Sequence, residues 1–406
     1  MKYIVVIGDG MADYPLPQLG GKTPLQAAVK PAMDELAGRG IMGLARTIPE
    51  GMPAGSDTAN LAVMGYDPRR YHSGRSPFEA AGLGVALEPG EISFRCNLVT
   101  LSSDEPYAQK TMLDYAAGEI TTEEARPLIE AINERFSAAP FRFYPGTSYR
   151  HLMIWPGGPD EWRFTPPHDI IGQTISSYLP QGPHSQVIRE IMEQSYSLLP
   201  EHPVNRARQA QGRRPANSIW IWGEGTRPQL PLFKDKYGLK GGVISAVDLI
   251  RGIGLYAGLE IITAEGATGN FNTNYTGKAE AALEALRRGL DFVYVHIEAP
   301  DECSHQYEIE KKVKSIELID RLVVQKLRSG LEQAGEPYKI LIMPDHYTPL
   351  SLRTHTADAV PFLIYPGDGH GLAGQAYDEA NAGKTGLVFQ EGHTLMDYFI
   401  QGAAVS

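Results

Sequence analysis

The stretch Tyr3-Ile4-Val5-Val6-Ile7-Gly8-Asp9-Gly10 decides how this chain is expected to fold. Its β-branched apolar residues are typical of a strand buried on both faces of a parallel sheet, and the Gly-Asp-Gly after them is typical of a turn. Four similar apolar runs occur later, at residues 259–262, 292–297, 338–343 and 360–364. Between them, the segments 279–288 and 308–331 repeat apolar residues every three or four positions, as amphipathic helices do. This alternation predicts an α/β fold with a mostly parallel sheet flanked by helices.

The middle of the chain has a different pattern, with candidate strands separated by Pro- and Gly-rich turns. The expected strands are 93–101, 141–144, 151–155 and 218–222, with amphipathic helices near 121–136 and 184–198. We interpret this block as a smaller α+β domain inserted into the α/β domain. The expected boundaries are 92–223 for the inserted domain, and 1–91 together with 224–406 for the larger one.

Composition narrows the classes of function. The chain has 406 residues, of which 42% are hydrophobic, and a formal net charge of -11. Because an acidic protein is not attracted to phosphate backbones or anionic lipid, we expect no nucleic-acid and no membrane partner. Two cysteines, a short apolar run at the N-terminus and no membrane-length apolar stretch predict a soluble, cytoplasmic protein. Nothing in the sequence indicates the oligomeric state.

Acidic, imidazole and hydroxyl side chains fall into four groups that we expect at the C-terminal edge of the sheet, where ligands bind in open α/β folds. These groups are Asp9; Ser56 within residues 53–61; Asp301 with His305; and Asp345 and His346 with His355. Each has an ordinary structural interpretation as well. Asp9 and Ser56 are suited to capping a helix, and an Asp and a His four residues apart also occur as a surface pair.

Taken together, the seven side chains predict a metal site. They combine carboxylates, imidazoles and one hydroxyl, a mixture that suits Mn²⁺ or Zn²⁺ better than Mg²⁺. Two such ions would lower the pKa of the serine hydroxyl and screen the charge of a phosphate group. Ser56 is then expected to attack phosphorus and to form a phosphoserine.

Several motifs carry a resemblance to a known family. The chain is similar to the alkaline phosphatase superfamily and, more closely, to the archaeal-type, cofactor-independent (2,3-bisphosphoglycerate-independent) phosphoglycerate mutases. The motifs are Gly8-Asp9-Gly10, Ala54-Gly55-Ser56-Asp57-Thr58-Ala59-Asn60-Leu61, Gly65-Tyr66-Asp67-Pro68, Asp345-His346, and residues 19–25, 74–80, 94–98, 266–269, 296–301 and 355–362. They extend over nearly the whole chain.

The resemblance implies an alkaline-phosphatase-like core and a set of roles. Asp9, Ser56, Asp345 and His346 match the residues that hold one metal ion, and Asp301, His305 and His355 match those that hold the other. Ser56 matches the phosphorylated nucleophile. The implied reaction is the interconversion of 3-phosphoglycerate and 2-phosphoglycerate with two divalent ions (Mn, Zn or Mg) and without 2,3-bisphosphoglycerate. The inserted domain is expected to close over this small phosphorylated substrate.

A phosphorylated acid also needs cationic side chains for its carboxylate. The candidates for substrate binding are Arg75, Arg95, Asn97, Arg150, His168, Asp169 and Lys240. Each of them is equally suited to a solvated surface charge or a structural ion pair. His168 and Asp169 follow two prolines, and general acid–base catalysis is a further role for them.

Other functions share the same residues. Residues 8–15 and 49–53 resemble a bacterial branch of the family proposed to act as homoserine kinases, which would keep the metal ions and Ser56 but use a different acceptor. A phosphatase-type hydrolase is a third interpretation. A binding or scaffold protein that has lost catalysis is a fourth, and the retention of all seven candidate metal-site residues argues against it.

Overall fold

The structure is a computed structural model that describes residues 1–158, 163–366 and 375–402. The chain forms two compact units, Met1–His72 with Gln229–Ser406, and Ser73–Pro228. The second unit thus begins before residue 92 and ends after residue 223, the boundaries expected from the sequence. It begins earlier because the helix α5 (Ser76–Gly82) packs on its sheet, and it ends later because the last strand of that sheet continues to Thr226. The Ser76 hydroxyl donates a 2.9 Å hydrogen bond to the Ser93 carbonyl, and Ala80 is buried against Leu152 and Ile154.

An eight-stranded, mostly parallel sheet is the centre of the first unit, which confirms the α/β fold. Its strand order is β13-β2-β12-β11-β1-β10-β8-β9. The strands are β1 (Lys2–Gly8), β2 (Ile41–Ala45), β8 (Gly241–Ile244), β9 (Glu260–Ile261), β10 (Phe292–Ile297), β11 (Tyr338–Met343), β12 (Val360–Tyr365) and β13 (Val388–Phe389). Central β1 runs parallel to β10 and β11, with Val5 paired to Tyr294 and Leu341. Among the strands of this sheet that the structure describes, β12 alone runs antiparallel to both of its neighbours.

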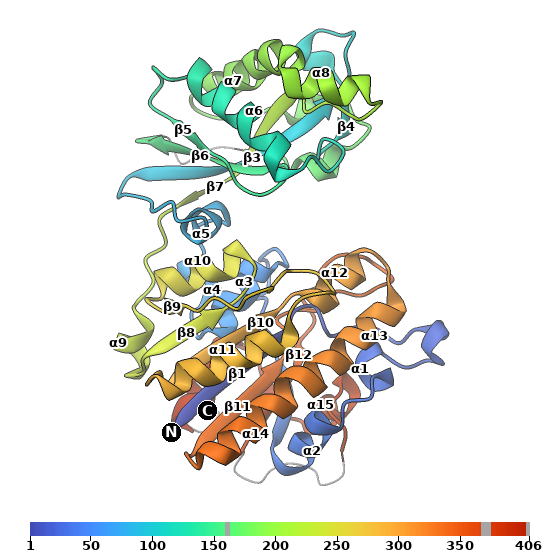
Figure 1. Cartoon of the computed structure of the whole chain (residues 1–406), viewed down its shortest axis with the longest axis vertical. Helices are drawn as coiled ribbons and strands as arrows, with labels where there is room; N and C mark the ends of the chain where they lie inside the picture. The colour runs from blue at the N-terminus through green and yellow to red at the C-terminus, as the bar shows by residue number, and fades with distance from the viewer. Residues whose placement is uncertain (159–162, 367–374, 403–406) are drawn as a thin grey trace. The chain divides into compact units, whose positions relative to one another are not determined.

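Helices cover both faces of this sheet. On one face α2 (Pro31–Arg39), α11 (Tyr275–Arg287), α13 (Ile309–Leu318) and α14 (Gln325–Ala334) pack on Ile4 and Val6. The π-helical residues Ile319–Val324 join α13 to α14 in one continuous helical run, and Figure 1 shows α11 beside α14. The opposite face carries α3 (Ser56–Val63), α9 (Phe233–Tyr237) and α16 (Thr394–Gln401), as the 5.7 Å ring contact between Tyr3 and Phe399 shows. The other α-helices described in the unit are α1 (Pro24–Ala27), α4 (Pro68–Tyr71), α10 (Asp248–Tyr256), α12 (Ala299–His305) and α15 (Glu379–Lys384), and a 3-10 helix covers Pro17–Leu19.

The second unit is an antiparallel sheet with helices packed on it, an α+β arrangement as the sequence predicts. Its strands are β3 (Glu91–Leu101), β4 (Met112–Asp114), β5 (Arg142–Tyr144), β6 (Arg150–Pro156) and β7 (Ser218–Thr226). Long β3 lies between β6 and β7 and pairs with both. Besides α5, the helices are α6 (Thr122–Arg135), α7 (Ser185–Leu198) and α8 (Pro203–Ala210). Phe94, Leu128 and Trp220 lie in its apolar core.

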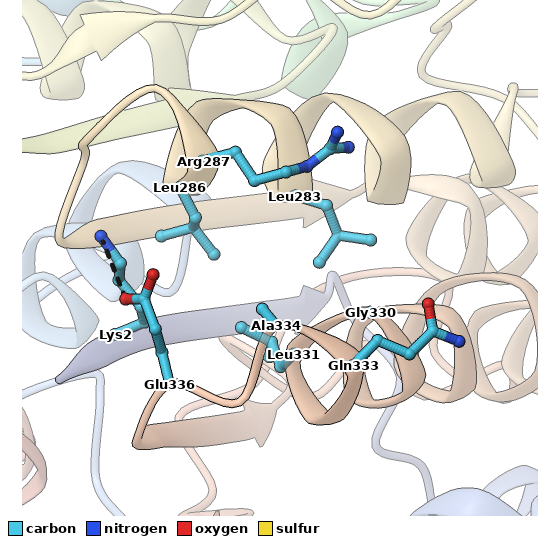
Figure 2. A pocket seen from close by; sticks show the side chains of 9 residues that line it. All are labelled: Lys2, Leu283, Leu286, Arg287, Gly330, Leu331, Gln333, Ala334 and Glu336. Atoms are coloured by element: carbon cyan, nitrogen blue, oxygen red, sulfur yellow. Dashed lines mark ion pairs between the residues drawn. The ribbon is translucent and has the colours of Figure 1, made fainter.

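A groove of about 380 Å³ lies between α11 and α14 (Figure 2). Leu283, Leu286 and Leu331 line it, and an ion pair between Lys2 and Glu336, with 3.7 Å between Lys2 Nζ and Glu336 Oε2, lies beside them. Lys2 begins β1, so the groove lies at the edge of the sheet where the parallel strands start. The candidate site residues follow the ends of those strands, at the opposite edge.

Each described helix is too short or too polar to span a lipid bilayer.

Candidate active site

The turn after β1 brings Asp9 to the C-terminal edge of the sheet. The Asp9 side chain is almost fully buried, and its backbone N–H donates a 2.9 Å hydrogen bond to the Ile297 carbonyl at the end of β10. Gly10 has a φ of +60°, and a Cβ atom there would lie 2.4 Å from Thr348 Oγ1 and 2.7 Å from Asp301 Oδ1. Glycine is required at this position because the backbone is left-handed and the neighbouring loops approach closely.

Ser56 is the first residue of α3, and its hydroxyl faces His346. The distance from Ser56 Oγ to His346 Nε2 is 3.1 Å. The Asn60 amide, one turn further along α3, donates hydrogen bonds of 2.8 Å to the Ser56 carbonyl and to Asp345 Oδ2. Backbone N–H groups at the start of a helix attract anions, so Ser56 lies where a phosphate group is favoured.

A first group of ligand atoms comes from Asp9, Asp345 and His346, all of them buried. His346 Nε2 lies 3.5 Å from Asp9 Oδ1 and 3.4 Å from Asp345 Oδ2. The oxygen Asp9 Oδ1 accepts no hydrogen bond from the residues that the structure describes. A buried carboxylate oxygen without a hydrogen-bond donor, beside an imidazole nitrogen, fits a divalent cation.

A second group surrounds Asp301. His305 Nε2 lies 3.2 Å from Asp301 Oδ2, and His355 Nε2 lies 3.4 Å from Asp301 Oδ1. The two histidine Nε2 atoms are 3.1 Å apart. Asp301 and His305 are four residues apart on α12 and lie on one face of it, as the sequence predicts.

The two groups are contiguous at His346. Its ring lies 4.1 Å from that of His355, centroid to centroid, and the atoms of Asp301, His346 and His355 are also close enough to share one ion. The resemblance matched His346, with Asp9, Ser56 and Asp345, to the ligands of one metal ion. In the structure it lies between the two groups, so the seven residues form one continuous cluster.

The charges of the cluster are unbalanced without a cation. Burial, together with the negative charges of Asp345 and Asp301, holds the pKa of the Asp9 carboxyl well above its usual range. Burial also raises the pKa of Asp345, but the adjacent His346 and His296 outweigh that effect and lower it. Three buried carboxylates so close together repel one another, and a divalent ion removes that repulsion. The donor set therefore fits a divalent metal site.

Sequence reasoning missed residues that support the cluster. His296 Nε2 lies 3.0 Å from Asp9 Oδ2, and both side chains are almost fully buried. Thr348 Oγ1 lies 2.6 Å from Asp301 Oδ1. A polar residue within the apolar run of β10 was the available signal for His296; Thr348 carried no signal beyond its place two residues after His346.

Six of the proposed substrate-binding residues belong to the second unit, and most of them gather around Glu79 and Trp222. Arg75 Nε and Arg95 Nε lie 2.8 and 2.9 Å from the two carboxylate oxygens of Glu79. The Arg95 guanidinium lies over the Trp222 ring, with its Cζ atom 4.2 Å from the ring centroid. The centroids of the His168 and Trp222 rings are 5.5 Å apart. Asn97 Oδ1 accepts a 3.0 Å hydrogen bond from Trp222 Nε1.

The charge of this group is positive. Burial raises the pKa of Glu79, but the charges of Arg95, Arg75 and Arg150 outweigh that effect and lower it. One carboxylate thus faces three guanidinium groups. Asp169 is exposed and lies 3.6 Å from His168 Nε2, which is the ordinary surface pair that the sequence also allowed.

Lys240 does not lie with the metal-site cluster. It directly precedes β8, and its backbone N–H donates a 3.0 Å hydrogen bond to Asp291 at the start of β10. It is therefore at the edge where the parallel strands begin, whereas Asp9 follows the end of β1. The expected role of Lys240 in substrate binding therefore stays a prediction, made for a residue at the edge opposite to Asp9.

Comparisons with known proteins give one family. Residues 37–205 match the family described as 2,3-bisphosphoglycerate-independent phosphoglycerate mutase. A Geobacter sulfurreducens protein named "Probable 2,3-bisphosphoglycerate-independent phosphoglycerate mutase" is 52% identical over 98% of this chain and 100% of its own length. A Methanothrix thermoacetophila protein named 2,3-bisphosphoglycerate-independent phosphoglycerate mutase is 49% identical over 99% of this chain and 100% of its own.

Solved structures show the same fold. A Pyrococcus horikoshii protein is similar with a TM-score of 0.80 and 29% identity, over 100% of this chain and 98% of that one. The cofactor-independent phosphoglycerate mutase of Thermoplasma acidophilum is similar with a TM-score of 0.65 and 26% identity, over 100% of both chains. Fold and site together define an α/β enzyme with a divalent metal site beside a serine at a helix start. Within that class, the chain belongs to the family of 2,3-bisphosphoglycerate-independent phosphoglycerate mutases.

Proposed function

We propose that this chain is an isomerase that interconverts 3-phosphoglycerate and 2-phosphoglycerate through a phosphoserine on Ser56. The observation that carries the proposal is the position of Ser56 Oγ, 3.1 Å from His346 Nε2 in the cluster of metal-ligand residues. The names of the similar proteins support the same reaction, and they do not favour the homoserine-kinase alternative or a phosphatase.

We propose two metal positions in the cluster. Asp9, Ser56, Asp345 and His346 would hold one divalent ion, and Asp301, His305 and His355 the other. When bound, such ions (Mn²⁺ or Zn²⁺ in preference to Mg²⁺) lower the pKa of the serine hydroxyl and screen the negative charge of the phosphate. No 2,3-bisphosphoglycerate is needed, because the phosphate group stays on the enzyme between the two half-reactions.

The residues of the chain perform a two-step exchange. Ser56 Oγ attacks phosphorus, the bond from phosphorus to the 3-oxygen of glycerate breaks, and the serine proton ends on that oxygen. The 2-hydroxyl of glycerate then attacks the phosphoserine, the bond between Oγ and phosphorus breaks, and a proton returns to Ser56. Throughout, the N-terminus of α3 stabilises the negative phosphate. The Asn60 side-chain amide fixes Ser56 by donating a hydrogen bond to the Ser56 backbone carbonyl.

The substrate carboxylate needs a cationic site, and the second unit offers one. We propose Arg75, Arg95 and Arg150 as its binding residues, with Asn97 holding Trp222 beneath Arg95. His168 is the proposed acid–base group of that unit, with Asp169 as its surface partner. We place this reaction in the cytoplasm, where phosphorylated sugar acids are metabolised.

The test uses protein stripped of metal by a chelator. Mn²⁺ or Zn²⁺ is added back, 3-phosphoglycerate is supplied without 2,3-bisphosphoglycerate, and 2-phosphoglycerate is detected through coupled enolase. We expect turnover that depends on the metal ion and is abolished in Ser56→Ala, with the thermal midpoint of that variant unchanged. Absence of turnover in a protein that binds metal would overturn the mutase activity, and residual activity in Ser56→Ala would overturn the phosphoserine.

A further inference from the structure

Thr348 is a fully buried residue whose backbone is fixed on both sides. Its N–H donates a 3.3 Å hydrogen bond to the Ala12 carbonyl, and its carbonyl accepts a 3.0 Å hydrogen bond from Lys312 Nζ. Lys312 is itself held by an ion pair of 2.7 Å with Asp13. The hydroxyl of Thr348 therefore has a defined position.

That hydroxyl contacts one residue from each proposed metal position. Thr348 Oγ1 lies 2.6 Å from Asp301 Oδ1 and 3.2 Å from His346 Nδ1. Gly10 leaves the space for it, since a Cβ atom at Gly10 would lie 2.4 Å from the same hydroxyl oxygen. The hydroxyl is thus a direct link between Asp301 and His346.

The direction of these two hydrogen bonds follows from the donors that are present. An ionised carboxylate only accepts, so the single hydroxyl hydrogen of Thr348 must point to Asp301; otherwise two acceptors would face each other at 2.6 Å. Thr348 then offers His346 only a lone pair, and His346 Nδ1 must carry the hydrogen. The other nitrogen of the neutral ring, Nε2, keeps its lone pair, and Nε2 is the atom that faces Ser56 and Asp9.

We infer that Thr348 is a positioning residue that prepares both metal positions at once: it orients the Asp301 carboxylate and holds His346 in the Nδ1–H form. The inference rests on the proposed function only in taking Asp301 and His346 as metal ligands. Loss of the hydroxyl then weakens metal binding at both positions. Hydrogen bonds to metal ligands from the surrounding protein are typically worth roughly 10- to 100-fold in metal affinity.

The first experiment compares variants of the full chain after removal of metal. Thr348→Val keeps the shape and removes the hydroxyl, Thr348→Ser restores the hydroxyl, and Mn²⁺ alone is titrated with detection of the free ion by electron paramagnetic resonance. Thr100→Val is the matched control, because its buried hydroxyl also donates a 2.7 Å hydrogen bond to a carbonyl, that of Pro215 in the second unit. We expect Mn²⁺ affinity to fall roughly 10- to 100-fold in Thr348→Val only. Wild-type affinity in Thr348→Val overturns the inference, as does failure of Thr348→Ser to restore it.

The second experiment needs no variant of Thr348. Proton–nitrogen correlation spectra of the metal-free wild-type protein report the tautomer of each histidine, and His346 is assigned by loss of its signals in His346→Gln. We expect the Nδ1–H form, and the Nε2–H form overturns the inference. Neither experiment depends on turnover. A chain that lacked mutase activity but gave these results would refute the proposed function and leave the role of Thr348 standing.

Discussion

Lys312→Met removes one member of a buried ion pair that joins two loops of the metal-site cluster. Lys312 and Asp13 are both fully buried, with 2.7 Å between Nζ and Oδ2. Lys312 Nζ also donates to the carbonyls of Ala12 and Thr348. Of the donors to the Asp13 carboxylate within the described residues, the variant keeps two backbone N–H groups, those of Tyr14 and Leu350.

The magnitude follows from the charge that is left behind. Removing one partner of a buried ion pair costs about 3 to 5 kcal/mol, because the remaining charge stays desolvated without its counterion. For a unit of about 250 residues, each kcal/mol lowers the melting temperature by about 2 to 4 °C, so we expect a decrease of roughly 6 to 20 °C. Two carbonyl groups also lose a donor, which favours the larger values.

The distribution of tryptophan makes the assay specific. All four tryptophans, at positions 155, 162, 220 and 222, fall within the range Ser73–Pro228. Tryptophan fluorescence therefore follows the second unit, while calorimetry and far-ultraviolet circular dichroism follow the whole chain. We expect the melting temperature of the first unit, measured by calorimetry, to fall, and the midpoint of the fluorescence transition to stay unchanged.

The double variant Asp13→Asn/Lys312→Met provides the decisive comparison. It removes both charges, so we expect it to be more stable than Lys312→Met alone. The reasoning is refuted if Lys312→Met lies within about 1 kcal/mol of the wild type, a loss ordinary for any substitution. It is equally refuted if the losses of the two single variants simply add in the double variant.

Three further outcomes are expected. Gly10→Ala should destabilise the first unit by more than the roughly 1 to 2 kcal/mol that a left-handed backbone costs, and it should also weaken Mn²⁺ binding. Gly20→Ala is the control, because Gly20 has a similar φ with open space around it, so this variant should show the backbone cost alone. If denaturation and Mn²⁺ titration give equal effects for the two variants, the close contact at Gly10 is contradicted. Burial raises the pKa of Glu379 to about 7, so between about pH 4.5 and 7 the folded state holds a proton that the unfolded state has released. The free energy of unfolding should therefore fall as the pH rises through this range. Glu379→Gln should flatten that dependence in denaturation curves measured at several pH values, and an unchanged slope would contradict the argument. Arg208→Met should destabilise the second unit by about 3 kcal/mol, because the buried Arg208 guanidinium donates to two carbonyls and pairs with Glu124. Arg206 is exposed, so Arg206→Met should change stability by less than about 0.5 kcal/mol. Tryptophan fluorescence in denaturant measures both variants, and matching unfolding curves would refute the argument from burial.

The parts of the fold that depend on local pattern were predictable from the sequence. The apolar runs of β1, β10 and β11 are unbroken, so both their strand character and their parallel pairing could be expected. Asp9 and Asp345 directly follow such strands, which places them at one edge before any coordinates are known. The glycine before Ser56 and the helix-like run after it made Ser56 a candidate, and the resemblance to the family implied its role as nucleophile.

Features that depend on three-dimensional contact were not predictable. Lys240 has the right charge, but only the direction of β8 shows that it lies at the edge opposite to Asp9. His346 was assigned to one group, because nothing in the spacing of Asp345, His346 and His355 shows that the rings of the two histidines pack together. The second unit begins at Ser73 and not at residue 92, because α5 packs on β3 and β7, and nothing in the sequence of α5 indicates that packing.

The two compact units divide the proposed chemistry between separate lengths of chain. Every proposed metal ligand and the proposed nucleophile fall in Met1–His72 or Gln229–Ser406, and the residues proposed for the substrate carboxylate, Arg75, Arg95 and Arg150, fall in Ser73–Pro228. The chain passes from one unit to the other at only two points, after His72 and after Pro228. With the roles proposed here, acceptor preference can change within one continuous segment while the residues proposed to bind phosphate stay the same. For an engineer, exchange of residues 73–228 between members of the family is the corresponding experiment in substrate specificity.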